Sequence, residues 1–274
     1  MDGHLWDDGV AWLDGIPQDV DWRKPSAARV YDVHLGGAYN FAVDREVAAR
    51  VAAVMPELPA LLRANRSFLR RAVLHLVNSG VRQFLDLGSG IPTVGNVHEV
   101  ALGADQDSRI VYVDHDPVAV AHSRALLAKV PQAGAVLGDL RDPAAILADD
   151  TVRELLDFTQ PIGVLLVAVL HFVPDSDDPA AVVRSYLDAL VPGSYLVLSH
   201  ATSGEVGHVR DAAEEYSRSV DGFYLRNRDQ VTALLGDLTL VEPGLTGVAD
   251  WRPDSNDEPV SLAKLPAYAA VARI

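Results

Sequence analysis

The chain has 274 residues, a formal net charge of −15 and no cysteine, so disulfides and thiolate metal sites are excluded. The negative charge repels phosphate backbones and argues against nucleic-acid binding. No apolar run approaches the roughly 18 residues of a membrane span, and the acidic N-terminus is not a signal peptide, so we expect a cytoplasmic protein that does not bind a membrane.

The N-terminal part of the chain reads as a loose arm followed by helices. Residues 1–24 show no periodic pattern. Apolar residues recur at helical spacing from Asp44 to Met55 and more strongly from Leu61 to Val77, which predicts two helices. Asn65 lies on the apolar face of the second helix, and Arg66 borders that face.

From residue 80 onward, short apolar runs alternate with helical segments, which is typical of βαβ units and a mostly parallel sheet covered on both faces. Three of the helices begin with an aspartate and a proline, at Asp116, Asp142 and Asp178; aspartate caps the free N–H groups there, and proline needs no donor. The predicted strands are Gln83–Leu87, Ile110–Val113, Ala133–Leu137, Ile162–Leu170, Tyr195–Ser199, Leu238–Val241 and Tyr268–Arg273.

A glycine-rich turn follows the first predicted strand, in the stretch "FLDLGSGIPTVGN". Glycine at Gly88 and Gly90 lets the backbone approach a ligand closely. A dinucleotide fingerprint would need a third glycine where Thr93 stands. Asp86, two residues before the first glycine, instead suits S-adenosylmethionine (SAM), whose ammonium a carboxylate can hold directly or through water.

Carboxylates also follow the second and third predicted strands. Asp114, in "IVYVDHDP", could accept hydrogen bonds from both hydroxyls of a ribose, and Asp139, in "AVLGDLRDP", could accept one from an adenine amino group. Leu140 could add a backbone N–H or an apolar wall. The alternatives are an ordinary loop aspartate and a simple Gly-Asp turn.

Histidines near strand ends are candidates for a general base. His171 follows the fourth predicted strand, where it could take a proton from a substrate or form an uncharged wall. His200 and His34 leave the same alternatives open. The histidine spacing indicates no metal site, and the sequence has neither a Gly-x-Ser-x-Gly elbow nor a Walker loop.

Taken together, these motifs resemble the Rossmann-like SAM-dependent methyltransferases. More narrowly, the chain resembles an S-adenosyl methyltransferase family abundant in actinobacteria, formerly a domain of unknown function. Matching stretches include "PSAARVYDVHLGGAYNFAVDRE", "NRSFLRRAV", "GVRQFLDLGSGIPTVGNVHEVA" and "PGSYLVLSHAT", in this order between about residues 25 and 202. The first of them is not shared by methyltransferases in general. Pro92 departs from the general pattern, because a third glycine often stands at that position.

The resemblance implies an α/β fold with a doubly wound, seven-stranded, mostly parallel sheet and a reversed final hairpin. From the change of pattern after residue 79, we expect residues 1–79 to form an N-terminal arm and helical lid, and residues 80–274 the SAM-binding domain. The resemblance also implies cofactor contacts, with the methionine part held by Asp86, Gly88, Ser89 and Gly90, the ribose by Asp114 beside His115, the adenine by Asp139 and Leu140, and the sulfonium region floored by Ala168.

The stretch "VYDVHLGGAYNF", residues 30–41, carries a second pair of glycines. SAM has no pyrophosphate that would need a second glycine-rich loop, and the turn at Gly88–Gly90 already serves it. We therefore interpret this stretch as a lid. Such a lid would exclude water from the methionine half of SAM. The alternative is an ordinary surface turn. The residues expected to cover the cofactor are Tyr31, Asp32, Gly36, Gly37 and Asn40, with Asn65 and Arg66 reaching toward the same place.

We therefore expect a SAM-dependent methyltransferase that acts on a small molecule. Catalysis would depend chiefly on aligning the acceptor and excluding water. Two alternatives remain: a SAM-binding regulator without turnover, and an NAD(P)-dependent oxidoreductase, against which Thr93 counts. Residues 203–267 should supply much of the acceptor pocket, with Tyr216, Phe223, Tyr224 and Trp251 as candidate walls. The sequence predicts neither the acceptor nor the oligomeric state.

Overall fold

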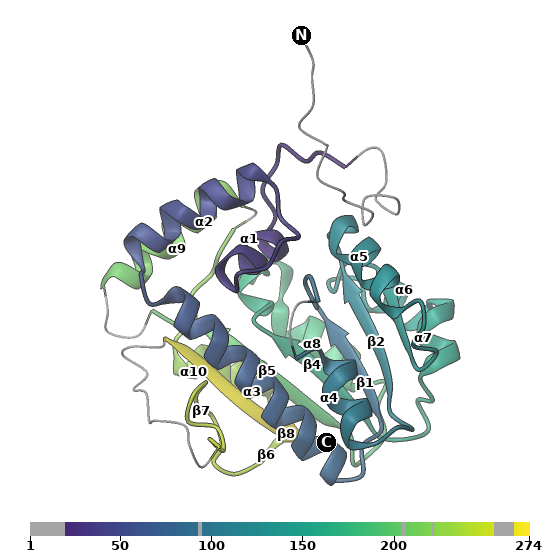
Figure 1. Cartoon of the computed structure of the whole chain (residues 1–274). Coiled ribbons are helices and arrows are strands. Elements are labelled where there is room, and N and C mark those ends of the chain that lie inside the picture. The colour runs from purple at the N-terminus through teal and green to yellow at the C-terminus, as the bar shows by residue number, and fades with distance from the viewer. Residues whose placement is uncertain (1–19, 93–94, 204–206, 221, 255–265) are drawn as a thin grey trace.

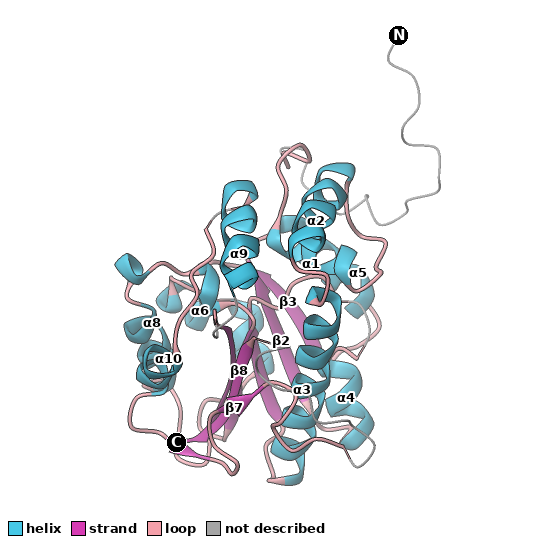
Figure 2. Ribbon diagram, turned by 90° about the vertical axis from the view of Figure 1, so that its left-hand side faces the viewer, coloured by secondary structure: helices cyan, strands magenta, loops and turns pink. Residues whose placement is uncertain are grey.

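A central sheet with helices on both faces forms the body of the protein (Figures 1 and 2). The computed structural model describes residues 20–92, 95–203, 207–220, 222–254 and 266–274, so most of the expected N-terminal arm lies outside the described residues. The strands are β1 Gln83–Leu87, β2 Arg109–Asp114, β3 Ala133–Leu137, β4 Ile162–Val167, β5 Tyr195–Ala201, β6 Thr239–Leu240, β7 Thr246–Gly247 and β8 Ala267–Arg273. The helices are α1 Ala27–His34, α2 Ala42–Val54, α3 Leu58–Asn78, α4 Val97–Ala104, α5 Pro117–Leu127, α6 Pro143–Ala148, α7 Asp150–Leu155, α8 Pro179–Leu187, α9 Gly207–Ser219 and α10 Arg228–Leu235.

The strand order confirms the predicted Rossmann-like topology. Seven strands follow the path β3-β2-β1-β4-β5-β8-β6, and the two-residue β7 pairs with β8 beside it. Strands β1 to β5 are parallel, whereas β8 runs antiparallel to β5 and β6. The order reverses between β1 and β4, and ligands in such sheets bind outside the carboxyl ends at this point.

Two apolar layers hold the sheet, one on each face. Helices α3, α4 and α5 pack on one face, where Phe68 and Leu76 of α3 are fully buried. Helices α6, α7, α8 and α10 cover the other face. Because both faces are covered, the central strands read as continuous apolar runs, and every residue of β1 is buried.

The three aspartate-proline helix starts are confirmed. The Asp116, Asp142 and Asp178 side chains each accept a hydrogen bond from a backbone N–H in the first turn of α5, α6 and α8. This capping fixes where the helices begin, and therefore where the loops at the carboxyl ends of β2, β3 and β4 end.

The fourth strand is shorter than the sequence predicts. It ends at Val167, Ala168 has a φ of 57°, and Leu170–Phe172 forms a 3-10 turn. The apolar run beyond Val167 is buried by loops and helices rather than by the sheet, and an apolar run alone cannot separate these cases. The turn places His171 beside the strand ends.

Three helices lie over the carboxyl edge of the sheet. Figure 1 shows α1 and α2 there, with α9 running beside α2. Arg29 on α1 forms buried ion pairs with Asp44 on α2, at 2.8 Å, and with Asp116, at 3.2 Å. Arg29 thereby joins α1 and α2 to the cap of α5. The domain boundary after residue 79 stays a prediction. Helix α3 precedes this boundary and nevertheless packs on the sheet, as α4 does.

Candidate functional site

A cavity lies beneath α1 at the carboxyl ends of β1, β2 and β4, and we call it the polar cavity. It collects side chains and backbone from the glycine turn, the loop after β2, helix α3 and the end of β4. The predicted cofactor residues that line it are Tyr31, Asn65, Arg66, Asp86, Gly88, Ser89, Gly90, Asp114, His115 and Ala168.

The glycine turn needs its glycines. Gly88 and Gly90 have φ values of 71° and 66°, in the left-handed region that favours glycine. A Cβ on Gly88 would lie 2.1 Å from Cγ2 of Val169, so the turn passes close against the end of β4. The N–H of Gly90 donates to Oδ2 of Asp114 at 2.7 Å, which ties the turn to the loop after β2.

Asp114 is a buried carboxylate held in place by backbone donors. Besides the bond from Gly90, its Oδ1 accepts from the N–H of Asp116 at 2.9 Å. Burial raises the pKa of Asp114, while the neighbouring His115 and the two N–H donors act in the opposite direction. Each oxygen keeps a lone pair that can accept from a ligand hydroxyl.

Asp86 is a buried carboxylate with no hydrogen bond to any described residue, although it lines the polar cavity. Burial raises its pKa to about 7; the positive charge of Arg66 opposes this shift, and Asp114 adds to it. A ligand cation beside Asp86 would compensate the cost of burying the charge. The Asp86 carboxylate can therefore accept hydrogen bonds from the ammonium of a bound amino-acid group.

Asp139 and Leu140 lie in an adjoining outer cleft, which shares His115, Val169 and Phe172 with the polar cavity. Arg141 donates to both carboxylate oxygens of Asp139 and lowers its pKa. The carbonyl of Leu140 accepts from the Tyr186 hydroxyl at 2.9 Å. The cleft can therefore hold a ligand group against an already fixed loop.

Four of the expected lid residues, Asp32, Gly36, Gly37 and Asn40, line none of these cavities; they build the turn between α1 and α2. Buried Asp32 accepts from the backbone N–H of Tyr39 at 2.9 Å and from the side chain of Asn40 at 2.8 Å. A Cβ on Gly37 would lie 1.9 Å from Oδ1 of Asp32. Direct contact of these four residues with a cofactor stays a prediction.

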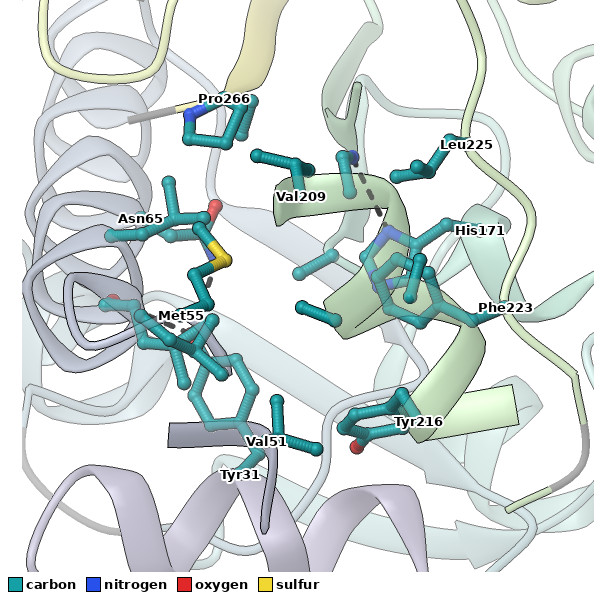
Figure 3. A pocket seen from close by; sticks show the side chains of 18 of the residues that line it. Tyr31, Val51, Met55, Asn65, His171, Val209, Tyr216, Phe223, Leu225 and Pro266 are labelled. Carbon is teal, nitrogen blue, oxygen red and sulfur yellow. Dashed lines mark hydrogen bonds between the residues drawn. The ribbon is translucent and has the colours of Figure 1, made fainter. Parts of the chain in front are cut away.

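A second cavity, which we call the apolar cavity, adjoins the polar cavity. Figure 3 shows Val51, Met55 and Asn65 on one side of it, with His171, Tyr216 and Phe223 facing them. The two cavities share four wall residues, Tyr31, Asn65, Ala168 and Phe172. A group bound in one cavity can therefore meet a group bound in the other.

A chain of hydrogen bonds crosses this shared wall. The N–H of Ala168 donates to the Ser199 hydroxyl at 2.9 Å, and that hydroxyl donates to Oδ1 of Asn65 at 2.6 Å. The amide nitrogen of Asn65 donates to the Tyr31 hydroxyl at 3.1 Å. The network fixes Asn65, although it lies on an otherwise apolar helix face.

His171 is buried in the wall of the apolar cavity. Its Nδ1 accepts from the N–H of Ala201 at 3.4 Å, and its ring lies 4.5 Å from that of Phe223. Burial, with His200 and Arg226 nearby, lowers its pKa well below the usual value. The neutral ring therefore carries its proton on Nε2, which makes it a poor general base and a good wall.

His200 is kept neutral mainly by its burial, and it contacts Arg226, a residue that the sequence analysis missed. Its Nδ1–H donates to the carbonyl of Ala201 at 2.7 Å, and its Nε2 accepts from the buried Arg226 at 2.9 Å. Burial lowers the pKa of His200 to about 4. Arg226 also donates to the carbonyls of Leu170 and Val173 and so fixes the turn that carries His171.

The four aromatic residues expected to line the pocket of the methyl acceptor lie in different places. Tyr216 and Phe223 line the apolar cavity. Tyr224 is exposed in the outer cleft, and Trp251 is fully buried in the core against Phe68. Ser199, which the sequence analysis missed, lies two residues before the end of β5, close to the carboxyl edge where the rule used for Asp114 looks for ligand contacts. Arg226 gave no comparable signal.

The described residues contain no group of three or more histidine, aspartate or glutamate side chains that could hold a metal ion. None of the helices in the described ranges is both long and apolar enough to cross a membrane.

Comparisons with known proteins identify the family. The model of the S-adenosyl methyltransferase family matches residues 14–274. A candidate methyltransferase from Thermobifida fusca has a crystal structure with 37% identity and a TM-score of 0.90, over 98% of this chain and 99% of that one. A DUF574 family protein from Streptomyces avermitilis has 38% identity and a TM-score of 0.89, over 92% of this chain and 98% of that one.

A more distant structure shows the same fold. The plantazolicin methyltransferase BamL, in complex with a triazolic desmethylPZN analog and SAH, has 13% identity and a TM-score of 0.54, over 92% of this chain and 97% of that one. No curated protein matches the chain. The family match covers nearly the whole chain, and the strand order and the glycine turn are consistent with it. The chain therefore belongs to the S-adenosyl methyltransferase family and is a SAM-dependent methyltransferase.

Proposed function

We propose that this methyltransferase holds SAM in the polar cavity and transfers its methyl group to a small molecule in the apolar cavity. The observation that carries this proposal is the wall shared by the two cavities, formed by Tyr31, Asn65, Ala168 and Phe172. A methyl group leaving the first cavity across this wall arrives directly in the second.

The lining residues suit the parts of SAM. We assign the methionine ammonium to Asp86, the methionine backbone to the turn at Gly88–Gly90, and the ribose hydroxyls to Asp114, with His115 beside it. The adenine would lie toward the outer cleft, near Asp139 and Leu140. Arg66 and Asn65 reach the methionine end from α3, and Ala168 lies at the shared wall.

When bound, SAM supplies an electrophilic methyl group on a sulfonium, and the protein's task is alignment and exclusion of water. Helices α1 and α2 cover the strand ends, and the Ala168–Ser199–Asn65–Tyr31 chain fixes the passage between the cavities. We assign His171 to the wall beside the acceptor. Its lowered pKa does not favour proton uptake.

Family membership separates this function from the alternatives. An NAD(P)-dependent oxidoreductase disagrees with the family, and a regulator without turnover would not need the second cavity. The negative net charge supports a small acceptor rather than a nucleic acid. The cytoplasmic location expected from the composition stays a prediction.

Calorimetry with SAM tests the cofactor site. Wild-type protein should bind SAM and not NAD, and Asp114→Ala should lose at least about tenfold in affinity, because two hydroxyls lose a charged acceptor. Asp211→Ala, on the exposed side of α9, is the control. Equal affinities for wild type and Asp114→Ala would remove the ribose contact from the proposal.

Labelled SAM tests the transfer. Incubation with a small-molecule extract of the host should yield a labelled product of low mass. Tight SAM binding with label only in protein or nucleic acid, or in nothing, would contradict a small acceptor.

A further inference from the structure

The chemistry of the apolar cavity restricts the acceptor further, if SAM occupies the polar cavity as proposed. Within the described residues that line it, the cavity has no aspartate, glutamate, lysine or arginine. A charged acceptor would lose its hydration there without gaining a charged partner. The cavity therefore selects against ions.

The two long walls differ in character. Helices α2 and α3 contribute aliphatic side chains such as Val51 and Met55, and the facing wall contributes aromatic rings (Figure 3). His171, Phe172 and Phe223 lie within 4.5 to 5.5 Å of one another, centroid to centroid. A flat ring placed between these walls would contact an aromatic surface on one side and aliphatic groups on the other.

The polar groups of the cavity are almost all satisfied by the protein itself. The Tyr31 hydroxyl is bonded to Asn65, the Tyr216 hydroxyl donates to the carbonyl of Ala27, and both nitrogens of His200 are engaged. Two ring nitrogens are the exceptions among the described lining residues. Nε2 of His171 forms no hydrogen bond, and the buried Nε2 of His34 has no hydrogen-bond partner in the described chain.

His34 therefore points to one polar feature of the ligand. It stands three residues after Tyr31 on α1, so the two side chains share a helix face next to the shared wall. Leaving a buried nitrogen unsatisfied is costly, and a hydrogen-bonding group on the acceptor would remove that cost.

We propose that the methyl acceptor is an uncharged aromatic molecule that lies between the aliphatic and aromatic walls and carries a hydrogen-bonding group facing His34. The inference rests on the proposed function, because it takes the apolar cavity to be the acceptor site.

Three naphthalene derivatives that differ in charge test the selection against ions. Protein saturated with S-adenosylhomocysteine is titrated with 2-naphthol, 2-naphthoate and 2-naphthylmethylammonium at pH 7. The neutral naphthol should bind at least about tenfold more tightly than either ion. Equal or tighter binding of an ion would overturn the proposal.

A charge placed in the wall should reverse this preference. Ala212→Asp puts a carboxylate on the buried face of α9, so it should weaken 2-naphthol and favour the ammonium compound. Asp211→Ala, the exposed neighbour, should change neither. If Ala212→Asp does not fold, Phe223→Ala serves instead, and it should lose 2-naphthol while it retains S-adenosylhomocysteine.

His34→Leu isolates the hydrogen bond. It should weaken 2-naphthol by about tenfold and leave unsubstituted naphthalene unchanged, since only the first offers a hydroxyl. Equal losses for both would overturn the assigned role of His34. Each variant is first titrated with S-adenosylhomocysteine. Failure of the wild type to bind this compound would sink the proposed function itself, whereas normal binding without charge selection would sink only this inference.

Discussion

At the scale of single residues, the site depends on buried carboxylates, whose charged form is disfavoured by the loss of water. Asp86 is buried beside Asp114, and the protein gives it no hydrogen bond from a described residue. Such an arrangement costs folding free energy in the absence of ligand and favours binding of a cation. Stability and cofactor affinity are therefore in opposition at this position.

Asp86→Asn should make this opposition visible. The folded-state pKa of Asp86 is raised from 3.8 to about 7, so the folded protein holds the proton more tightly than the unfolded chain, and ionisation destabilises the fold increasingly as pH rises from 4 to 7. The neutral amide should stabilise the ligand-free protein above pH 7 by at most about 4 kcal/mol, and the gain should vanish near pH 4. Thermal unfolding across this range measures it.

The same substitution should remove the pH dependence of SAM binding. Wild-type affinity should fall as pH drops below about 7, because protonated Asp86 no longer attracts the ammonium. Asp86→Asn should bind weakly at every pH. A destabilised variant that keeps the wild-type pH dependence would contradict both assignments.

At the scale of elements, two buried polar groups of residues organise helices α1 and α2, which we propose to act as a lid. Asp32 organises the turn between α1 and α2, and Arg29 fastens α1 to α2 and to the cap of α5. Asp116 therefore has two roles, as helix cap and as lid anchor. The helix start was predictable from its Asp-Pro pair, whereas the ion pair joins residues 87 positions apart.

Gly37→Val tests the turn. The new Cβ would overlap the Asp32 carboxylate and displace its bonds to Tyr39 and Asn40, so SAM affinity should fall. The melting temperature should fall as well, because a buried carboxylate loses its donors. Gly36→Ala is the matched control, because its Cβ meets open space and only the φ of 80° opposes it, at about 1 kcal/mol. A collapsed fold with unchanged residual SAM affinity would mean that Gly37 is purely structural.

Arg29→Met tests the anchor. Removing the guanidinium leaves Asp44 and Asp116 buried without their cation, which should cost about 3–5 kcal/mol of unfolding free energy. Arg50→Met breaks an exposed ion pair between α2 and Glu215 on α9, and it should cost no more than about 1 kcal/mol. If urea denaturation gave similar losses of unfolding free energy for the two variants, the buried Arg29 ion pairs would contribute no more than an exposed pair.

At the scale of the whole molecule, the proposed cofactor touches segments that are far apart in the sequence. The polar cavity joins α1, α3 and the loops after β1, β2 and β4. A ligand that bridges them should stabilise the lid and the sheet together. Free SAM at roughly 100 times its Kd should add about 2.7 kcal/mol to the unfolding free energy.

Hydrogen exchange locates this stabilisation. With SAM, amides of α1 and of the loops after β1 and β2 should exchange more slowly, while local opening of α10, which lines none of the cavities described above, should not change. Protection confined to the loops, with α1 unaffected, would contradict a lid that closes on the cofactor.

The sequence by itself determined the approximate positions of the main strands along the chain, the capped helix starts, the glycine turn and the carboxylates at or near the ends of β1, β2 and β3. These features follow from local periodicity, backbone geometry and the rule that parallel strands present their carboxyl ends at one edge. Tertiary structure alone decided that β4 stops at Val167, that Asp32 faces Gly37 rather than a cavity, and that Arg226 supports His171. The Arg226 contacts join residues more than 50 positions apart, and the Asp32 turn depends on non-periodic hydrogen bonds within residues 32–40, so neither leaves a periodic signal along the chain. The apolar cavity is also decided at this level. Its walls come from α1, α2, α3, β5, α9, the turn after β4 and the segment after α9, and no one of them is unusual on its own.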